Sequence, residues 1–173
     1  SGKDFGCRFT YKVQDQAGGI AQALALAENF ANRKPLAVIL GDNIFQTNLK
    51  SHADKFMAQK AGARILLKQV EYPQRFGVAE LSDGRIIGIE EKPERPKSNY
   101  AVTGIYFYDA SVFEIIRTLK PSARGELEIT HVNDAYIAGG RLAYDILEGW
   151  WTDAGTFESL ARANELVLSE PPQ

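Results

Sequence analysis

Hydrophobic residues in the first half of the chain switch between a period of two and a helical period. Polar and apolar residues alternate over 8–13, which predicts a strand. Apolar positions three and four apart predict a helix from Ile20 to Ala31. Residues 36–40 form a continuous aliphatic run, which is typical of a buried parallel strand. A further helix is expected over about 49–59.

The second half of the chain has more segments of strand period. Ser82-Asp83-Gly84 separates two of them and is a strong hairpin signal. Strands are expected over 63–70, 76–81, 85–91, 100–108 and 142–147, and helices over 111–119, from about 126 to 137, and after a capping Thr156. Alternating strands and helices favour a parallel sheet covered on both faces, whereas the hairpin requires antiparallel pairing. We therefore expect one Rossmann-like α/β domain over residues 1–173, with a mixed β-sheet flanked by helices.

Composition narrows the class of protein without identifying it. The chain has 173 residues, 45% of them hydrophobic and 24% charged, as in an ordinary globular domain. A net charge of -2 gives no electrostatic reason to expect nucleic acid or an anionic membrane as partner. The lone Cys7 excludes an internal disulfide framework and a cysteine-based zinc site, which fits a reducing cytoplasm. His52 and His131 lie far apart in polar stretches, and both are expected in solvent.

Two acidic turns follow predicted strands. Asp42 comes directly after the aliphatic run 36–40, and Asp153 follows Trp150-Trp151. Ligands of open α/β sheets collect beyond the carboxyl ends of strands, and Mg²⁺ prefers one or two carboxylates with waters and substrate phosphates. The alternative is that Asp42 and its neighbour Asn43 only form a turn or a helix cap. Sequence spacing does not show whether the two turns meet.

Cationic residues occupy two comparable positions. In Glu90-Glu91-Lys92-Pro93, Lys92 could hold a phosphate while Glu91 accepts hydrogen bonds from hydroxyl groups; the alternative is a solvated run of charges. Arg124 lies just before a predicted helix, where an anion would meet a guanidinium and free backbone N–H groups, or it is a plain surface arginine. No P-loop motif is present, and no Ser, Cys or His has a recognisable nucleophile setting.

A series of motifs follows in a fixed order along nearly the whole chain. The motifs are Val13–Ala23 with its Gly18-Gly19 turn, Leu40-Gly41-Asp42-Asn43-Ile44-Phe45, Arg75-Phe76-Gly77-Val78, Glu90-Glu91-Lys92-Pro93, Pro96–Tyr106, Lys120–Thr130 and Gly149–Thr156. In this order they resemble the sugar-phosphate nucleotidyltransferases, and in particular the members that use dTTP and glucose 1-phosphate.

The resemblance implies a reaction and a role for each matching residue. Glucose 1-phosphate would attack the α-phosphorus of dTTP, giving dTDP-glucose and pyrophosphate. The reaction would require Mg²⁺, and the intact protein would assemble as a dimer or tetramer. The matching positions are Asp42 and Asp153 for the metal; Gln14, Gly19, Ile20 and Leu40 for the thymine base; Gly77, Glu91, Val102 and Tyr106 for glucose; Lys92 and Arg124 for the phosphates; and Trp151 near the sugar-phosphate pocket.

One part of the family pattern is not found in this sequence. Family members open with a strand and a Gly-rich loop that carries a catalytic arginine and, further on, a lysine. We therefore expect an N-terminally truncated fragment that lacks the first βαβ unit and turns over poorly by itself. Two alternatives stay open: a related enzyme that uses UTP or another sugar phosphate, and a non-catalytic protein that binds sugar nucleotides.

Overall fold

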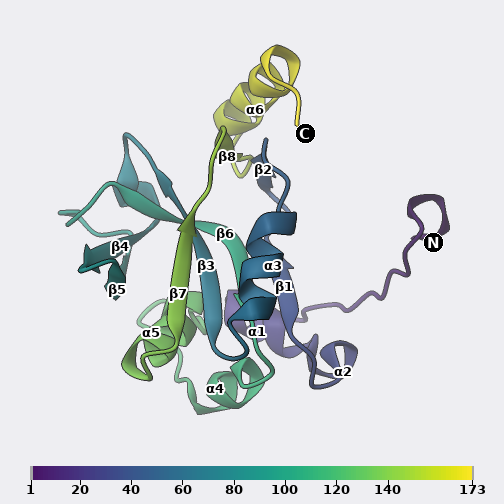
Figure 1. Cartoon of the computed structure of the whole chain (residues 1–173), viewed down its shortest axis with the longest axis vertical. Coiled ribbons are helices and arrows are strands. Elements are labelled where there is room, and N and C mark those ends of the chain that lie inside the picture. The colour runs from purple at the N-terminus through teal and green to yellow at the C-terminus, as the bar shows by residue number, and fades with distance from the viewer. Residues whose placement is uncertain (1, 173) are drawn as a thin grey trace.

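The computed structural model describes residues 2–172. It contains an α/β domain built on a curled mixed sheet, with helices against both faces (Figure 1). The strands are β1 (Leu36–Ile39), β2 (Asn43–Phe45), β3 (Ala63–Gln69), β4 (Gly77–Ser82), β5 (Arg85–Glu91), β6 (Tyr100–Tyr108), β7 (Leu142–Ile146) and β8 (Trp151–Asp153). The helices are α1 (Ile20–Ala25), α2 (Glu28–Ala31), α3 (Lys50–Ala58), α4 (Val112–Thr118), α5 (Ile129–Ala138) and α6 (Phe157–Ser169), with 3₁₀ turns at Gly2–Phe5 and Pro73–Arg75. The predicted fold class is confirmed.

The long strand β6 organises the sheet. The strand order is β5-β4-β6-β3-β7, and β1 also pairs with β6. On one side β6 pairs with β3; on the other, β1 pairs with 105–108 while β4 reaches only Ala101. The stretch 102–104 of β6 therefore lies where the sheet divides between β1 and β4. This division places backbone and side chains of β6 at the base of a cleft.

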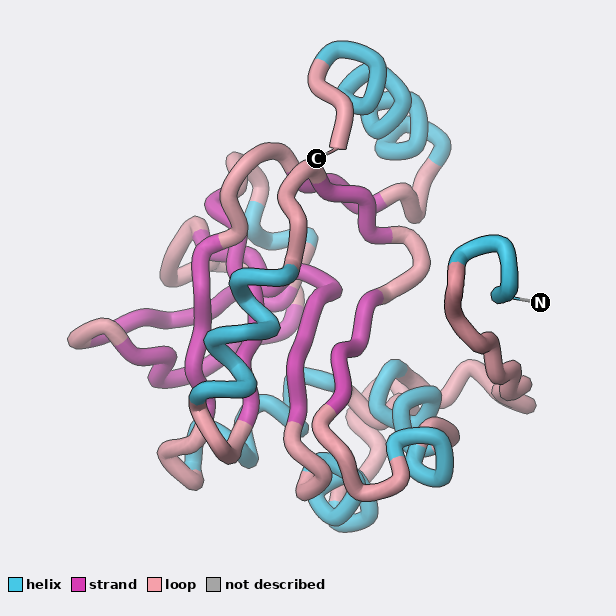
Figure 2. The backbone as a smooth tube through the Cα atoms, turned by 45° about the vertical axis from the view of Figure 1, so that its right-hand side comes forward, coloured by secondary structure: helices cyan, strands magenta, loops and turns pink. Residues whose placement is uncertain are grey.

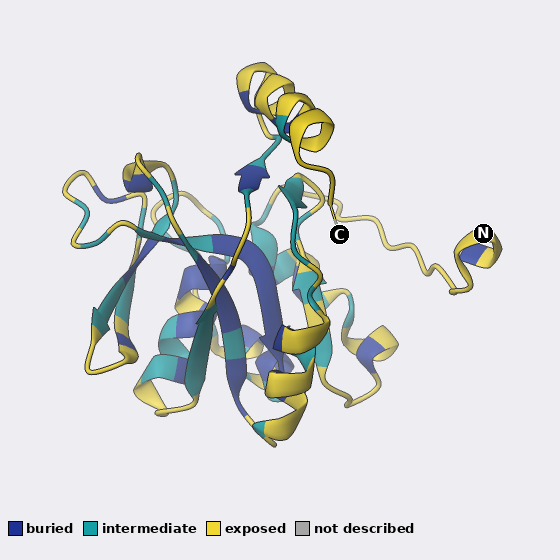
Figure 3. Ribbon diagram, turned by 45° about the horizontal axis from the view of Figure 1, so that its top comes forward, coloured by how far each residue is buried: buried dark blue, intermediate teal, exposed yellow. Residues whose placement is uncertain are grey.

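Alternate residues of β6 pack on opposite faces of the sheet. Tyr106 and Tyr108 belong to a core shared with α1, α4 and α5. Ile105 and Phe107 belong to a second core, where the Phe107 ring lies 5.7 Å from that of Phe56 in α3. Burial of each such side chain contributes about 1.5–3 kcal/mol. The dark-blue centre of Figure 3 follows these central strands, so the most buried part of the molecule is the middle of the sheet.

Several local predictions are confirmed. The hairpin joins β4 to β5 through Asp83 (φ 49°) and Gly84 (φ 73°), the left-handed pair that a tight hairpin turn requires. Thr156 caps α6, accepting a hydrogen bond from the Ser159 backbone at 3.1 Å. Within residues 2–172, no helix has both the length and the apolar character needed to cross a bilayer.

The predicted strand at 8–13 is wrong. This segment is an extended arm that leads away from the body of the molecule (Figure 2). Phe9, Tyr11 and Val13 are 48%, 77% and 81% exposed. Alternating polarity fits a pleated, half-buried surface, but a strand forms only where a neighbour supplies hydrogen bonds. No neighbouring strand lies beside the arm in the described part of the chain.

Three further expectations need correction. The run 36–40 forms a strand, but β1 is antiparallel to β6 and exposed along one side, with Ile39 48% exposed. The helix expected over 20–31 divides into α1 and α2 at a turn. His52 is only 5% exposed because its ring nitrogen hydrogen-bonds the Asp145 carboxylate at 3.0 Å, whereas His131 is exposed as expected.

Candidate active site

The two acidic turns meet in space. β2 and β8 form a small antiparallel pair in which Asn43 lies opposite Asp153, and the backbone N–H of Ala154 donates to the Asp42 carbonyl at 2.7 Å. A Cβ atom built on Gly155 would lie 3.4 Å from Oδ2 of both Asp42 and Asp153. Both carboxylates thus converge on the space in front of one glycine. The pairing of β2 with β8, more than 100 residues apart in sequence, produces this convergence.

Asn43 fixes this junction through its side-chain amide. Its Oδ1 accepts hydrogen bonds from the indole N–H of Trp151 at 2.7 Å and from the Gly104 backbone N–H at 3.0 Å. Its Nδ2 donates to Oδ1 of Asp42 at 2.9 Å. A Cβ on Gly104 would lie 2.5 Å from Asn43 Nδ2, so only glycine admits the amide at this point of β6. One side chain therefore links both acidic turns to the division in the sheet.

A cleft of about 240 Å³, open to solvent, lies over this division. It brings together ten of the thirteen site residues that the resemblance implies. Its lining consists of Ile20, Leu40, Asp42, Asn43, Arg75, Phe76, Gly77, Glu91, Lys92, Val102, Gly104, Tyr106, Ile129, Thr130, Asn133, Trp151 and Asp153.

One end of the cleft offers neutral and anionic hydrogen-bonding groups. Glu91 accepts a hydrogen bond from the hydroxyl of Thr130 at 3.0 Å, which fixes its carboxylate. A Cβ on Gly77 would lie 3.2 Å from the same Oε2 atom, so glycine leaves room beside it. Burial raises the pKa of Tyr106, and the charges of Glu91 and Asp42 raise it further. The phenol therefore stays protonated and can donate a hydrogen bond.

Cations lie beside the carboxylates. Lys92 has a left-handed backbone (φ 46°), an unfavourable conformation for lysine, and its N–H donates to the Phe76 carbonyl at 3.0 Å. The Arg75 guanidinium lies 4.0 Å from Asp153 and over the Phe76 ring, at 5.7 Å from its centroid. Phe76 in turn packs edge-on against Trp151, with 5.2 Å between centroids. An anionic ligand in the cleft would thus have positive charge next to the paired carboxylates.

Three of the implied site residues do not line the cleft. Gln14 lies on the arm and donates to the Gly19 carbonyl at 3.2 Å. Gly19 (φ 94°) packs so closely on the backbone of Leu127 that a Cβ would lie 2.5 Å from its carbonyl oxygen. Arg124 is turned toward Glu128, whose carboxylate it contacts at 2.9 Å; this hydrogen bond raises the pKa of Arg124.

The donor set suits Mg²⁺. Within residues 2–172 no group of three or more His, Cys, Asp or Glu side chains is arranged to hold a metal. A dedicated zinc cage, which needs such a set, is therefore absent from the described chain. Two convergent carboxylates in an open cleft match the coordination preference of Mg²⁺, which keeps several waters and takes its other ligands from substrate phosphates.

Sequence reasoning missed several residues of the cleft. The sequence pattern accounts for Asn43 only as a turn or cap residue, and it gives no reason to select Arg75, Gly104, Thr130 or Asn133. The identity of Gly104 is explained only when the approach of Asn43 is known. Thr130 and Asn133 are three residues apart in the predicted helix, but nothing in the pattern shows that this face meets β5 and β6.

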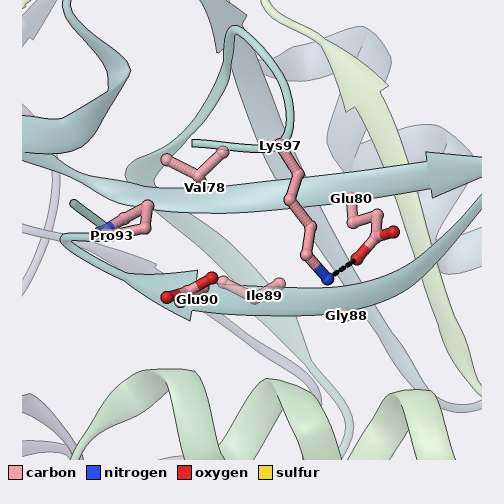
Figure 4. A pocket seen from close by; sticks show the side chains of 7 residues that line it. All are labelled: Val78, Glu80, Gly88, Ile89, Glu90, Pro93 and Lys97. Atoms are coloured by element: carbon pink, nitrogen blue, oxygen red, sulfur yellow. Dashed lines mark hydrogen bonds and ion pairs between the residues drawn. The ribbon is translucent and has the colours of Figure 1, made fainter. Parts of the chain in front are cut away.

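A second, smaller cavity of about 130 Å³ lies under the loop that follows β5 (Figure 4). The side chain of Lys97 extends across it and pairs with Glu80 at 2.7 Å. Its lining is completed by Val78, Gly88, Ile89, Glu90 and Pro93. The ion pair holds the loop against the hairpin, and this cavity lacks the convergent groups of the first.

The fold and cleft define a class of protein, and comparison with known proteins identifies it. The model of the nucleotidyl transferase family matches residues 1–170, and the chain belongs to this family. Glucose-1-phosphate thymidylyltransferases from Neisseria meningitidis serogroup A and from Mycobacterium tuberculosis are each 45% identical to it over 170 residues, which is 96% of this chain. The chain spans about 59% of the length of these relatives.

Solved structures agree with the fold. A Bacillus anthracis protein assigned as a glucose-1-phosphate thymidylyltransferase, crystallised with sucrose, superposes with a TM-score of 0.91 at 58% identity, covering 96% of this chain and 68% of that one. UDP-glucose pyrophosphorylase in complex with UDP-glucose gives a TM-score of 0.84 at 26% identity, covering 94% of this chain and 67% of that one.

Proposed function

We propose that this chain supplies the metal-binding and sugar-phosphate-binding part of a nucleotidyltransferase that joins dTTP to glucose 1-phosphate. A phosphate oxygen of the sugar phosphate attacks the α-phosphorus of dTTP. One P–O bond forms, the bond between the α- and β-phosphates breaks, and pyrophosphate leaves with the electron pair. The convergence of Asp42 and Asp153 at the mouth of a cleft lined by Glu91 and Lys92 is the observation that carries the proposal.

The residues of the chain would act by positioning and by charge. Asp42 and Asp153 would hold Mg²⁺, which supplies charge neutralisation on the phosphates when bound. Lys92 would bind a phosphate as a point charge, and Glu91, fixed by Thr130, would accept hydrogen bonds from sugar hydroxyls. The attacking phosphate is already ionised, so no general base is needed, and alignment of the reactants provides much of the rate.

Pyrophosphate release with dTTP, glucose 1-phosphate and MgCl₂ tests the reaction in the protein that carries this chain. We expect Asp42→Asn to lower Mg²⁺-dependent turnover at least about 100-fold, because one of two metal carboxylates is lost. Asp54→Asn, which changes an exposed carboxylate paired with Lys50, is the matched control and should leave the rate unchanged. An unchanged rate in Asp42→Asn would refute the metal role.

Two further measurements bear on the proposal. The similarity to UDP-glucose pyrophosphorylase makes UTP the main competing nucleotide, and a panel of dTTP, UTP, ATP and CTP decides between them. For the 173-residue chain alone we expect little or no turnover, since it spans about 59% of its relatives' length. Full activity from these residues would contradict that expectation.

A further inference from the structure

Asn133 is a buried polar residue with an unfilled hydrogen-bonding capacity at the edge of the cleft. It lies on α5 and is 1% exposed. Its Oδ1 accepts a hydrogen bond from the phenol of Tyr108 at 2.7 Å. Its Nδ2 has no partner among the described residues, although the side chain lines the cleft together with Ile129 and Thr130.

The orientation of this amide is constrained by its surroundings. Tyr108 is fully buried, and its ring stacks between those of Tyr106 and Tyr136, with centroids 5.9 Å and 5.7 Å away. If the amide turned over, Nδ2 would pair with the phenol and Oδ1 would lose its donor instead. In both orientations one amide atom is left without a protein partner. Such an unpaired buried group costs about 1–3 kcal/mol.

The neighbours of Asn133 indicate which chemical group of a ligand could hydrogen-bond its unpaired amide atom. Thr130, one helical turn earlier, holds the carboxylate of Glu91, and the phenol of Tyr106 on β6 also lines the cleft. A phosphate would be repelled by Glu91 at this end of the cleft. A hydroxyl group both donates and accepts, so a polyol can bond an anionic acceptor and an amide within one ring.

We propose that Asn133 is a specificity-determining residue that hydrogen-bonds one hydroxyl of the hexose of the sugar phosphate. The inference rests on the proposed function only in taking glucose 1-phosphate as the ligand. It adds a residue of α5 to the sugar contacts that are proposed on β4, β5 and β6. A hexose that lacks the hydroxyl in question would leave the buried amide unpaired, which is the condition under which a site discriminates strongly.

Binding of glucose 1-phosphate and its 2-, 3-, 4- and 6-deoxy analogues, measured by calorimetry without nucleotide, tests the inference. In the wild type we expect one deoxy analogue to bind about tenfold more weakly than glucose 1-phosphate, the effect of one lost hydrogen bond. In Asn133→Leu that difference should disappear. Asn99→Ala, in an exposed loop, should keep the wild-type ranking.

Two additions keep the test decisive. Asn133→Leu leaves the Tyr108 hydroxyl without its acceptor, so the double variant Asn133→Leu/Tyr108→Phe removes both partners and should fold like the wild type. In the wild type, the side-chain amide NMR signals of Asn133 should shift when glucose 1-phosphate is added. An unchanged ranking in folded variants, or no binding and no shift, overturns the inference. Discrimination in binding, with no nucleotidyl transfer by the protein that carries this chain, would refute the proposed function alone.

Discussion

Replacement of Asn43 by alanine should loosen the junction between the two acidic turns at Asp42 and Asp153. The amide holds the indole N–H of Trp151 at 2.7 Å and the Gly104 N–H at 3.0 Å, and it donates to Asp42 at 2.9 Å. Asn43→Ala leaves two donors without their acceptor. Trp151 is 9% exposed, so its donor is largely shielded from water. The third bond, to a carboxylate at the open mouth of the cleft, can be replaced by water.

The expected loss in free energy of unfolding follows from the two donors that lose their acceptor. A buried donor left unsatisfied costs about 1–3 kcal/mol, and partial access of water from the cleft favours the lower part of that range. We therefore expect Asn43→Ala to lower the free energy of unfolding by about 2 kcal/mol. In a domain of this size, this corresponds to a fall in Tm of about 4–8 °C.

Thermal and urea unfolding of the chain measure this loss, with Asn29→Ala, an exposed asparagine of α2, as the matched control. A double-mutant cycle with Trp151→Phe isolates the bond to the indole. Asn43→Ala should cost about 1 kcal/mol less in the Trp151→Phe background than in the wild type. Strict additivity of the two substitutions, or an unchanged Tm in Asn43→Ala, would show that the amide does not hold the junction.

Two other substitutions test the site and its support. Gly155→Leu should abolish Mg²⁺-dependent tightening of dTTP binding, because its side chain starts at a point 3.4 Å from the Asp42 and Asp153 carboxylates. Gly155→Ala should bind within about threefold of wild type, and equal binding by both variants would refute this. Asp145→Asn should destabilise the chain at pH 7 by about 3 kcal/mol, since it leaves the buried His52 and the partly buried Arg64 without their carboxylate. Burial opposes the charge of Asp145, but hydrogen bonds from His52 and Lys55 and the nearby Arg64 outweigh it and lower the pKa of Asp145. The stabilisation by the Asp145 carboxylate is therefore complete above the ordinary Asp pKa of about 3.9 and is lost as the pH falls through the lower pKa of the folded state. The urea midpoints of wild type and Asp145→Asn should converge in acid, and a constant difference between the two midpoints would contradict this.

Strand bounds, a hairpin turn and a helix cap could be predicted in this chain because they depend on residues close together in the sequence. β6 has the predicted bounds 100–108, the hairpin turns at Asp83-Gly84, and Thr156 caps α6. Each depends on the period of side-chain burial or on the backbone preference of one or two residues, which neighbouring residues determine. The motifs likewise carried the family, which the comparisons confirmed over residues 1–170.

The arm and β1 show where local pattern fails. Residues 8–13 have the alternation of a strand, but a strand is completed by hydrogen bonds to another segment. The run 36–40 has the aliphatic character of a buried strand, yet burial depends on what packs against each face, and Ile39 is 48% exposed. His52 is buried, although its polar neighbours in the sequence predict solvent exposure, because its hydrogen-bond partner Asp145 is 93 residues away.

The chemistry of the site was available in the sequence as separate pieces. The acidic turns at Asp42 and Asp153, the Glu91-Lys92 pair and the conformational freedom of the glycines are properties of residues and their immediate neighbours. Tertiary structure alone decided that β2 pairs with β8, that the sheet divides beside Gly104, and that Asn43 spans the gap. Convergence of side chains depends on the order and register of distant strands, and hydrophobic periodicity constrains which face of a strand is buried without specifying which strand lies next to it.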